Sequence, residues 1–205
     1  MNGTLESIVQ PYTYASPEQI GLLSRLVQAL DSEGIPGDIV ECGVFNGGSA
    51  AILAHFAAKS RFNRRVWLFD SFEGLPAPTE KDGPSSSGQR AEAATGACKG
   101  DINAVKRVLE LVDADMSRVN IVKGWYTDTF PAISISQIAM LSLDSDWYEA
   151  EKLCIEKFYP SVVPGGIIYS DDFFWWPGCQ RAITEFFDNK SKPLFNRVPS
   201  MWMQK

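Results

Sequence analysis

Two groups of aspartates are the residues of this chain best suited to chemistry. Asp144 and Asp146 lie in the run Leu-Asp-Ser-Asp-Trp-Tyr, and Asp171 and Asp172 lie in the run Tyr-Ser-Asp-Asp-Phe. Each group follows a short apolar run typical of a buried strand, and open α/β sheets bind ligands at the carboxyl ends of their strands. Carboxylates at such an edge suit a hard divalent cation, Mg²⁺ or Mn²⁺. Aspartate is also a common turn and helix-cap residue, so either group alone could serve only the backbone.

The elements that would position these aspartates alternate between strand and helix. Apolar runs predict strands at residues 38–42, 65–69, 119–123, 138–143 and 166–169, the last one after a Pro-Gly-Gly turn. Apolar residues at helical spacing predict helices at residues 17–34, 50–59, 102–112, 149–158 and 179–187. This alternation is typical of the α/β class, with a doubly wound, mainly parallel, Rossmann-like sheet. Residues 194–198 and 201–205 are predicted to form an antiparallel hairpin, which brings the sheet to seven strands.

We expect one domain across residues 1–205, because a chain of this length with 45% apolar residues can bury a single large core. Residues 1–34 are predicted to be a helical N-terminal segment, with a capping box formed by Ser16 and Gln19. Residues 74–100 are rich in Pro, Gly, Ser and Ala and are too long for an ordinary connector. This segment is either a lid or a disordered insertion, and its composition does not separate the two.

A glycine-rich turn joins the first predicted strand to the helix after it. The run Glu-Cys-Gly-Val-Phe-Asn-Gly-Gly-Ser, which starts at Glu41, brings backbone N–H groups close to a nucleotide-like ligand. It lacks the lysine of a phosphate-binding loop, and an acid at position 41 suits a cation or an amine better than a pyrophosphate. These features favour S-adenosylmethionine over NAD. Asp70 is placed to accept both ribose hydroxyls, and Trp125 is either an adenine-stacking residue or a core aromatic.

Seven sequence blocks, in order along nearly the whole chain, carry a resemblance to a known family. They are residues 11–13, 34–38, 40–49, 69–76, 123–131, 143–148, and 170–172 with 178–182. In these blocks the chain resembles the macrocin O-methyltransferase (TylF-type) family, class I enzymes that use S-adenosylmethionine to methylate hydroxyls of sugars or other natural products. The resemblance implies a class I methyltransferase fold for the predicted sheet.

The resemblance also implies roles for particular residues. The positions that match the family's Mg²⁺ ligands are Asp144, Asp171 and Asp172, and the position that matches its proposed general base is Asp146. The positions implied to contact the cofactor are Glu41, Gly43, Asn46, Gly47, Ser49, Asp70 and Ser71, with Gly124 and Trp125 near the adenine. Ser145 and Trp147 stand where family members usually have Gly and Met, and residues 173–176 are more aromatic than usual. These departures leave the metal ligands intact and point to a different acceptor pocket.

Together these features predict Mg²⁺-dependent O-methyl transfer to a small natural-product, sugar or phenolic acceptor, at one hydroxyl of a vicinal diol. Asp146 would share a strand face with Asp144 and take the proton from the attacking oxygen. Trp147, Trp175 and Trp176 either line the acceptor pocket or pack in the core. The alternatives are an NAD-binding oxidoreductase and a non-catalytic cofactor-binding protein.

Composition narrows the partners and the compartment. The formal net charge is −6 and no run of Lys or Arg forms a stripe, so we expect no nucleic acid and no anionic membrane as partner. The sequence shows neither a signal peptide nor an apolar stretch of membrane-spanning length, which predicts a soluble, cytoplasmic protein. Four dispersed cysteines and a single histidine argue against zinc and against a Cys-His catalytic set. The expected partner is a small-molecule acceptor, and the resemblance is consistent with a homo-oligomer.

Overall fold

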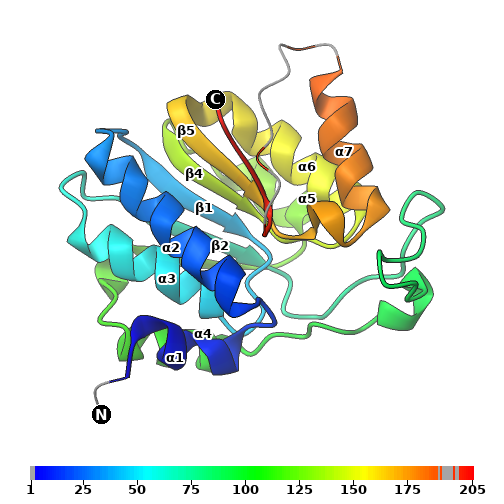
Figure 1. The fold of residues 1–205 in the computed structure, drawn as a ribbon, viewed down its shortest axis with the longest axis horizontal. Helices are drawn as coiled ribbons and strands as arrows, with labels where there is room; N and C mark the ends of the chain where they lie inside the picture. The colour runs from blue at the N-terminus through cyan, green and yellow to red at the C-terminus, as the bar shows by residue number, and fades with distance from the viewer. Residues whose placement is uncertain (1–2, 189, 191–195, 197–198) are drawn as a thin grey trace.

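The computed structural model describes residues 3–188, 190, 196 and 199–205, and its centre is one twisted sheet (Figure 1). The strands are β1 (Asp38–Cys42), β2 (Val66–Asp70), β3 (Val119–Lys123), β4 (Ile138–Leu143), β5 (Val162–Ser170) and β6 (Met201–Gln204). Their order across the sheet is β3-β2-β1-β4-β5-β6, and only β6 pairs antiparallel, along β5. The predicted α/β, doubly wound, mainly parallel class is therefore confirmed.

Helices follow most of the strands. They are α1 (Leu5–Val9), α2 (Pro17–Ser32), α3 (Gly48–Lys59), α4 (Ile102–Leu111), α5 (Tyr126–Thr129), α6 (Tyr148–Phe158) and α7 (Pro177–Phe187). Short 3₁₀ turns lie at Gln10–Tyr12, Ala91–Ala94, Met116–Arg118, Phe130–Ala132, Tyr159–Ser161 and Asp172–Phe174. The predicted capping box begins α2, since the side chains of Ser16 and Gln19 each accept a hydrogen bond from the other's backbone N–H.

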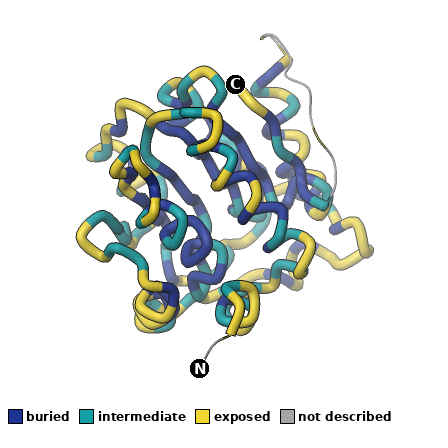
Figure 2. Tube along the Cα trace, turned by 60° about the vertical axis from the view of Figure 1, so that its left-hand side comes forward, coloured by how far each residue is buried: buried dark blue, intermediate teal, exposed yellow. Residues whose placement is uncertain are grey.

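The helices cover both faces of the sheet. Helices α2, α3 and α4 share one apolar cluster with Leu68 and Met140, while α6 and α7 share a second cluster with Leu141 and Ile168. Every residue of β4 is buried, as expected for a central parallel strand with a covered surface on each side. In Figure 2 the buried trace runs through the middle of the molecule and the exposed segments lie outside it.

Three details of the sheet differ from the prediction, the smallest being that β2 lies one residue later, at Val66–Asp70 rather than 65–69. Strand β5 begins at Val162, so the Pro-Gly-Gly sequence lies inside it rather than in a turn before it. Pairing with β4 breaks after Val162 and resumes at Ile167, and the excursion between them uses Gly165 at φ +81°. The described residues contain six strands rather than seven. Asn196 bridges Trp202, while residues 194, 195, 197 and 198 of the predicted hairpin lie outside the described residues.

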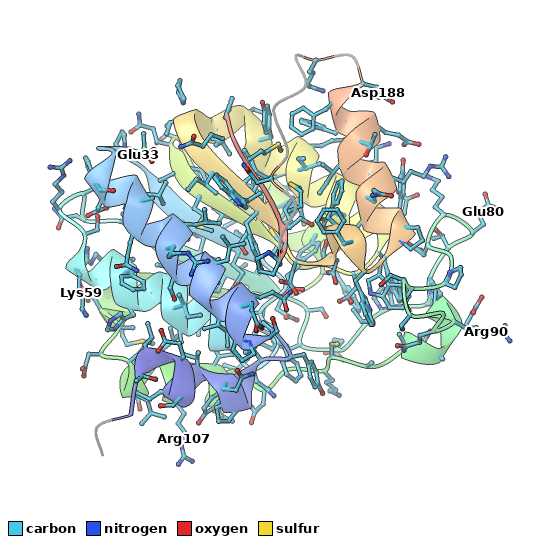
Figure 3. The ribbon with its side chains drawn as sticks, in the orientation of Figure 1. Glu33, Lys59, Glu80, Arg90, Arg107 and Asp188 are labelled. Atoms are coloured by element: carbon cyan, nitrogen blue, oxygen red, sulfur yellow. The ribbon has the colours of Figure 1, made fainter. Side chains whose placement is uncertain are left out.

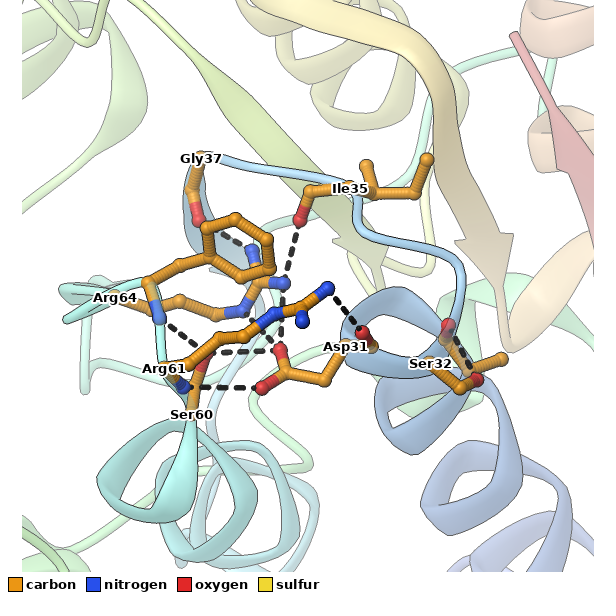
Figure 4. A network of polar contacts seen from close by, with 9 residues as sticks. Asp31, Ser32, Ile35, Gly37, Ser60, Arg61 and Arg64 are labelled. Atoms are coloured by element: carbon orange, nitrogen blue, oxygen red, sulfur yellow. Dashed lines mark hydrogen bonds and ion pairs between the residues drawn. The ribbon is translucent and has the colours of Figure 1, made fainter.

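A buried ionic network lies at the amino-terminal edge of the sheet (Figure 4). The Arg64 side chain is 1% exposed and donates to Asp31 Oδ1 from both Nε (3.1 Å) and Nη2 (2.7 Å). It also donates to the carbonyl oxygens of Ile35 at 2.6 Å and Gly37 at 2.7 Å. The network joins the end of α2, the approach to β1 and the α3–β2 connection, and it lies at the opposite edge from the aspartates.

Other charged side chains lie at the periphery. Figure 3 labels several exposed residues of both signs that project from the outer surface: Glu33, Lys59, Glu80, Arg90, Arg107 and Asp188. Among the described residues, no helix combines the length and the apolar character needed to cross a bilayer.

Candidate functional site

The carboxyl ends of β1, β4 and β5 meet closely at one edge of the sheet. The Asp144 N–H donates to the carbonyl of Cys42 at 2.9 Å, and the Asp171 N–H donates to the carbonyl of Leu143 at 3.0 Å. Gly43 makes this approach possible, because it has φ +92° and a Cβ atom there would lie 1.6 Å from the Asp144 carbonyl oxygen. The backbone hydrogen bonding between neighbouring strands thus continues past the strand ends and brings the two aspartate groups together.

Asp144, Asp171 and Asp172 form a compact carboxylate cluster. Each residue offers an oxygen such that all three atoms lie within 4.8 Å of one another. Asp171 Oδ1 accepts hydrogen bonds from Gln19 Nε2 at 2.8 Å and from the Tyr169 hydroxyl at 2.5 Å. An all-oxygen set of this kind fits Mg²⁺ or Mn²⁺, and the metal role itself stays a prediction.

The cluster carries more negative charge than its surroundings balance. Burial, and then the neighbouring carboxylates, raise the pKa of Asp144 and Asp172 well above the usual value. The described residues that line the adjoining cavity include no Lys, Arg or His. A bound cation would relieve this repulsion, so the chemistry of the donor set fits a metal.

Asp146 lies beside the cluster, but not for the reason given by the sequence. Strand β4 ends at Leu143, and Asp146 adopts φ +61° in the following turn, so it does not share a strand face with Asp144. Its N–H donates to Asp172 Oδ2 at 2.9 Å, and its Oδ1 accepts from Trp176 Nε1 at 2.9 Å. Burial raises the pKa of Asp146 to about 6, although the bond from Trp176 lowers it.

Glu151, on α6, is a site residue that the sequence analysis missed. Its carboxyl is fully buried and accepts from the hydroxyls of Ser145 at 2.5 Å and Ser170 at 2.9 Å. These serines precede Asp146 and Asp171, so Glu151 ties the two aspartate loops together. Burial raises the pKa of Glu151 to about 7, partly offset by the two serine bonds. Its position one helical turn into α6 gave no sequence signal beyond an ordinary acidic helix residue.

Glu41 lies in the sheet beneath the site. It is fully buried, and neither carboxyl oxygen has a partner that meets hydrogen-bond geometry among the described residues. Burial raises the pKa of Glu41 to about 8, with a smaller opposing effect from the Ser49 hydroxyl. Glu41 is absent from the cavity lining, whereas Ser49 is part of it.

Asp70 organises the glycine-rich turn. Its Oδ2 accepts from the N–H groups of Val44 at 2.8 Å and Phe45 at 2.9 Å, and its Oδ1 accepts from Phe72 N–H at 2.7 Å. The carboxylate still lines the cavity. With three of its roughly four acceptor positions in use, it has room for one further donor rather than for two ribose hydroxyls.

The remaining predicted cofactor residues divide into two groups. Gly43, Ser71, Gly124 and Trp125 line the cavity, and the Trp125 side chain is 42% exposed rather than packed in the core. Asn46 and Gly47 do not line it. Asn46 Oδ1 accepts from the Asp101 N–H before α4, and Gly47, at φ +91°, caps α3 close to α4. These two residues shape the turn that borders the cavity.

The cavity has a volume of about 700 Å³. One side is formed by the ends of β1, β2 and β3, and the other by the aspartates after β4 and β5. The sequence analysis missed the contribution of residues 12–15, just before α2, which also line it. Tyr14 is 81% exposed and stacks on Phe45, with ring centroids 5.0 Å apart.

Residues 74–100 lie along the cavity, and several of them line it (Figure 1, green, at the right). The segment is held by specific bonds. The buried Asp82 carboxylate accepts from the Tyr148 N–H at the start of α6 at 2.6 Å, and the Pro76 carbonyl accepts from Trp147 Nε1 at 2.9 Å. The segment therefore packs over the cavity as a defined cover, and its role as a lid stays a prediction.

The three tryptophans proposed for the acceptor pocket differ in placement. Trp175 and Trp176 line the cavity, and Trp175 is 43% exposed. Trp147 is 3% exposed and does not line it; it packs instead against Trp176, with ring centroids 4.8 Å apart. Its role is therefore in packing.

Comparison with known proteins gives consistent matches. The family model described as macrocin-O-methyltransferase (TylF) matches residues 9–196. The chain is 30% identical over 176 residues to the 8-demethyl-8-(2,3-dimethoxy-alpha-L-rhamnosyl)-tetracenomycin-C 4'-O-methyltransferase of Streptomyces olivaceus. The aligned region covers 85% of this chain and 67% of that protein. The chain is also 30% identical over 181 residues to the mycinamicin III 3''-O-methyltransferase of Micromonospora griseorubida, with 86% and 70% covered. The solved structure of the O-methyltransferase NovP superposes with a TM-score of 0.80 at 25% identity, covering 95% of this chain and 82% of that one.

Proposed function

The chain belongs to the macrocin O-methyltransferase (TylF) family of S-adenosylmethionine-dependent O-methyltransferases, and from this premise we propose that it methylates one hydroxyl of a vicinal diol with the help of a divalent cation. Family membership decides against the NAD-dependent oxidoreductase that the first strand and Asp70 would also permit. The observation that carries the proposal is the cluster of Asp144, Asp171 and Asp172, with oxygens within 4.8 Å and no basic side chain among the described cavity-lining residues.

The two sides of the cavity suit the two reactants. On the side of β1, β2 and β3, Ser71, Gly124 and Trp125 would contact S-adenosylmethionine, which supplies the methyl group. On the side of β4 and β5, the three clustered aspartates would hold Mg²⁺ or Mn²⁺, which when bound supplies Lewis acidity and a template for two adjacent hydroxyls. A sulfonium cofactor and a metal ion are both cations, so both are favoured by the local negative charge.

The chain's own residues would perform the remaining steps. The cover formed by residues 74–100 excludes water and fixes the acceptor, since in-line displacement depends on holding the attacking oxygen close to the methyl carbon. Asp146 would accept the proton of the attacking hydroxyl, because its carboxylate lies in the cavity wall next to the cluster. Burial raises the pKa of Asp146 to about 6 in the metal-free protein, and cations bound beside it would lower that pKa and favour the ionised form that accepts a proton.

The charge of the site defines the class of acceptor. Five carboxylates line the cavity without a described basic partner: Asp70, Asp144, Asp146, Asp171 and Asp172. An acceptor that carries a phosphate would be repelled, whereas a neutral or amine-bearing diol would not. Exposed aromatics at Trp125, Trp175 and Tyr14 suit an acceptor with an apolar body. We therefore propose a neutral or cationic natural-product, sugar or phenolic diol.

The test is binding and turnover measured together. S-adenosylmethionine is titrated into the protein by calorimetry, with Mg²⁺ and with EDTA. Neutral, amine-bearing and phosphorylated sugar diols and catechols are then screened by mass spectrometry for transfer of a methyl group. We expect saturable cofactor binding in both buffers, turnover of neutral or cationic diols only with Mg²⁺, and no turnover of the phosphorylated compounds. Full turnover in EDTA would refute the metal role, and a preference for phosphorylated diols would refute the acceptor class.

A further inference from the structure

The buried indole of Trp176 makes its hydrogen bond to the carboxylate of the proposed base, Asp146. Its side chain is 2% exposed, and its indole N–H donates to Asp146 Oδ1 at 2.9 Å. Among the residues that the structure describes, it is the one side chain that donates to this carboxylate. We infer that Trp176 is a positioning residue that fixes the direction of the Asp146 carboxylate in the cavity, an inference that rests on the proposed role of Asp146 as the base.

Asp146 has an uncommon backbone conformation, and separate contacts hold its backbone and its side chain. At φ +61° it is left-handed, a conformation that only Gly adopts freely and that Asp and Asn adopt more often than other residues. Its N–H is held by Asp172 Oδ2, which fixes the backbone but not the side-chain torsions. The bond from Trp176 supplies that second constraint, and it leaves Asp146 Oδ2 for a substrate proton.

Trp176 is itself held in place, both through its backbone and through its ring. Its backbone N–H donates to the Asp172 carbonyl at 2.9 Å, where the chain enters α7. Its ring packs edge-on against Trp147, and both rings share a small apolar cluster with Ala91 and Ala94 of the covering segment. The indole N–H of Trp147 donates to the Pro76 carbonyl of that segment, whereas the indole N–H of Trp176 donates to Asp146. The tryptophan pair therefore connects the cover to the proposed base.

A matched control exists at the other end of the sheet. Trp67 of β2 donates its indole N–H to Asp38 Oδ2 at 3.1 Å, which is the same type of bond at the amino-terminal edge. A Trp→Phe change at either position removes one indole–carboxylate bond and part of a ring. Only the change at position 176 alters the site.

The kinetic experiment compares Trp176→Phe with Trp67→Phe, each with saturating S-adenosylmethionine and Mg²⁺. We expect kcat to fall about ten- to a hundred-fold in Trp176→Phe, because a slightly misdirected catalytic group costs that much. The KM and the calorimetric Kd for S-adenosylmethionine should stay within about twofold, since Trp176 lies on the aspartate side of the cavity, and Trp67→Phe should keep its kcat. Equal kcat values in the two Trp→Phe variants, together with an inactive Asp146→Asn variant, would refute the positioning role and leave the base assignment standing.

A spectroscopic experiment covers the case in which Trp176→Phe does not fold. Each of the six tryptophans contributes one indole N–H resonance to an NMR spectrum of the ¹⁵N-labelled protein, and the Trp176 and Trp67 resonances are assigned by substitution. The Trp176 resonance should shift in Asp146→Asn and stay in place in Asp38→Asn, and the Trp67 resonance should do the reverse. A Trp176 resonance that ignores Asp146→Asn would refute the bond. Full turnover by Asp146→Asn would instead refute the base assignment of the proposed function, whatever the spectrum shows.

Discussion

At the scale of single residues, the defining feature is a set of buried carboxyls with too few positive partners. Asp144 is the clearest case: burial, then Asp171 and Asp146, raise its pKa well above the usual value. Glu41 and Glu151 add two further buried acids behind the cluster. Such an arrangement is costly for folding and useful for binding a cation, which places function ahead of stability at these positions.

Asp144→Asn tests whether this buried charge lowers stability and serves cation binding. Removing one charge should raise the melting temperature of the EDTA-treated protein at pH 8, because it removes repulsion from a buried cluster. The same change should remove the stabilisation that Mg²⁺ gives the natural protein and lower turnover by roughly a hundred-fold or more, since Lewis-acid assistance amounts to several kcal/mol. Thermal unfolding with and without Mg²⁺, and calorimetry with S-adenosylmethionine, report these effects. A variant that still responds fully to Mg²⁺ would place the metal elsewhere.

Much of this site could be predicted from residue types, and the missing parts have physical reasons. Asp144, Asp171 and Asp172 converge because parallel strands end at one edge, which the sequence reveals through its apolar runs. The position of Asp146 depends on a left-handed turn that no periodicity encodes, so the strand-face argument was wrong. Glu151 was missed because its serine partners lie in the turn after β4 and at the end of β5, which meet only in the folded chain.

At the scale of elements, strands β1, β3 and β4 have the predicted bounds, since each is a short apolar run between clear breakers. Strand β5 was misjudged because its Pro-Gly-Gly sequence normally marks a turn, yet the sheet accommodates it as an excursion within the strand. The covering segment, residues 74–100, has almost no regular structure, and its order comes from long-range bonds such as that between Asp82 and Tyr148. Composition alone does not reveal such bonds.

Asp82→Ala should loosen the covering segment. The change leaves the N–H groups of Thr79 and Tyr148 without their acceptor, which should cost about 2 kcal/mol of unfolding free energy. Limited proteolysis should become faster within residues 83–90, and the KM for the acceptor should rise. Asp115→Ala is the control, because Asp115 caps a 3₁₀ turn outside the cavity lining. Equal proteolysis rates in the two variants would show that Asp82 does not hold the cover.

Arg64→Met should act on stability alone. The change leaves the carbonyls of Ile35 and Gly37 without their Arg64 donor and Asp31 without its guanidinium partner, while Ser60 and the Arg61 N–H still donate to the Asp31 carboxylate. Asp31 remains 31% exposed, so water compensates part of the loss, and we expect about 2–4 kcal/mol of destabilisation. Urea unfolding measures it. The kcat of the folded variant should stay unchanged, because the network lies at the amino-terminal ends of the strands and the aspartates lie at the carboxyl ends. A fall in kcat would show that the two ends of the sheet are coupled.

At the scale of the whole molecule, the negative charge is concentrated rather than spread evenly. The chain has a net charge of −6, and its peripheral side chains carry both signs, whereas the charged side chains among the described residues that line the cavity are all acidic. The fold thus separates a mixed outer surface, which suits solvation, from a cavity that attracts cations. This separation makes the stability of the whole protein depend on pH and on bound cations.

The metal-free protein should lose stability as pH rises from about 4 to about 8. Burial raises the folded-state pKa of Glu41 to about 8, of Glu151 to about 7 and of Asp146 to about 6. Between the ordinary pKa of each group and its raised value, the folded state holds a proton that the unfolded chain has released. Folding therefore becomes less favourable with rising pH, and the penalty is complete only above the folded-state pKa.

Urea unfolding in EDTA at several pH values measures this dependence, and the same series with Mg²⁺ and S-adenosylmethionine gives the contrast. Bound cations favour the ionised carboxylates of the folded state, so the decline in unfolding free energy should be much shallower with ligands present. Glu41→Gln should flatten the metal-free curve near its upper end, because it removes the carboxyl whose raised pKa lies there. A metal-free protein whose stability rises over this pH range would mean that the buried carboxyls are ionised and paired, and the proposed attraction for cations would lose its physical basis.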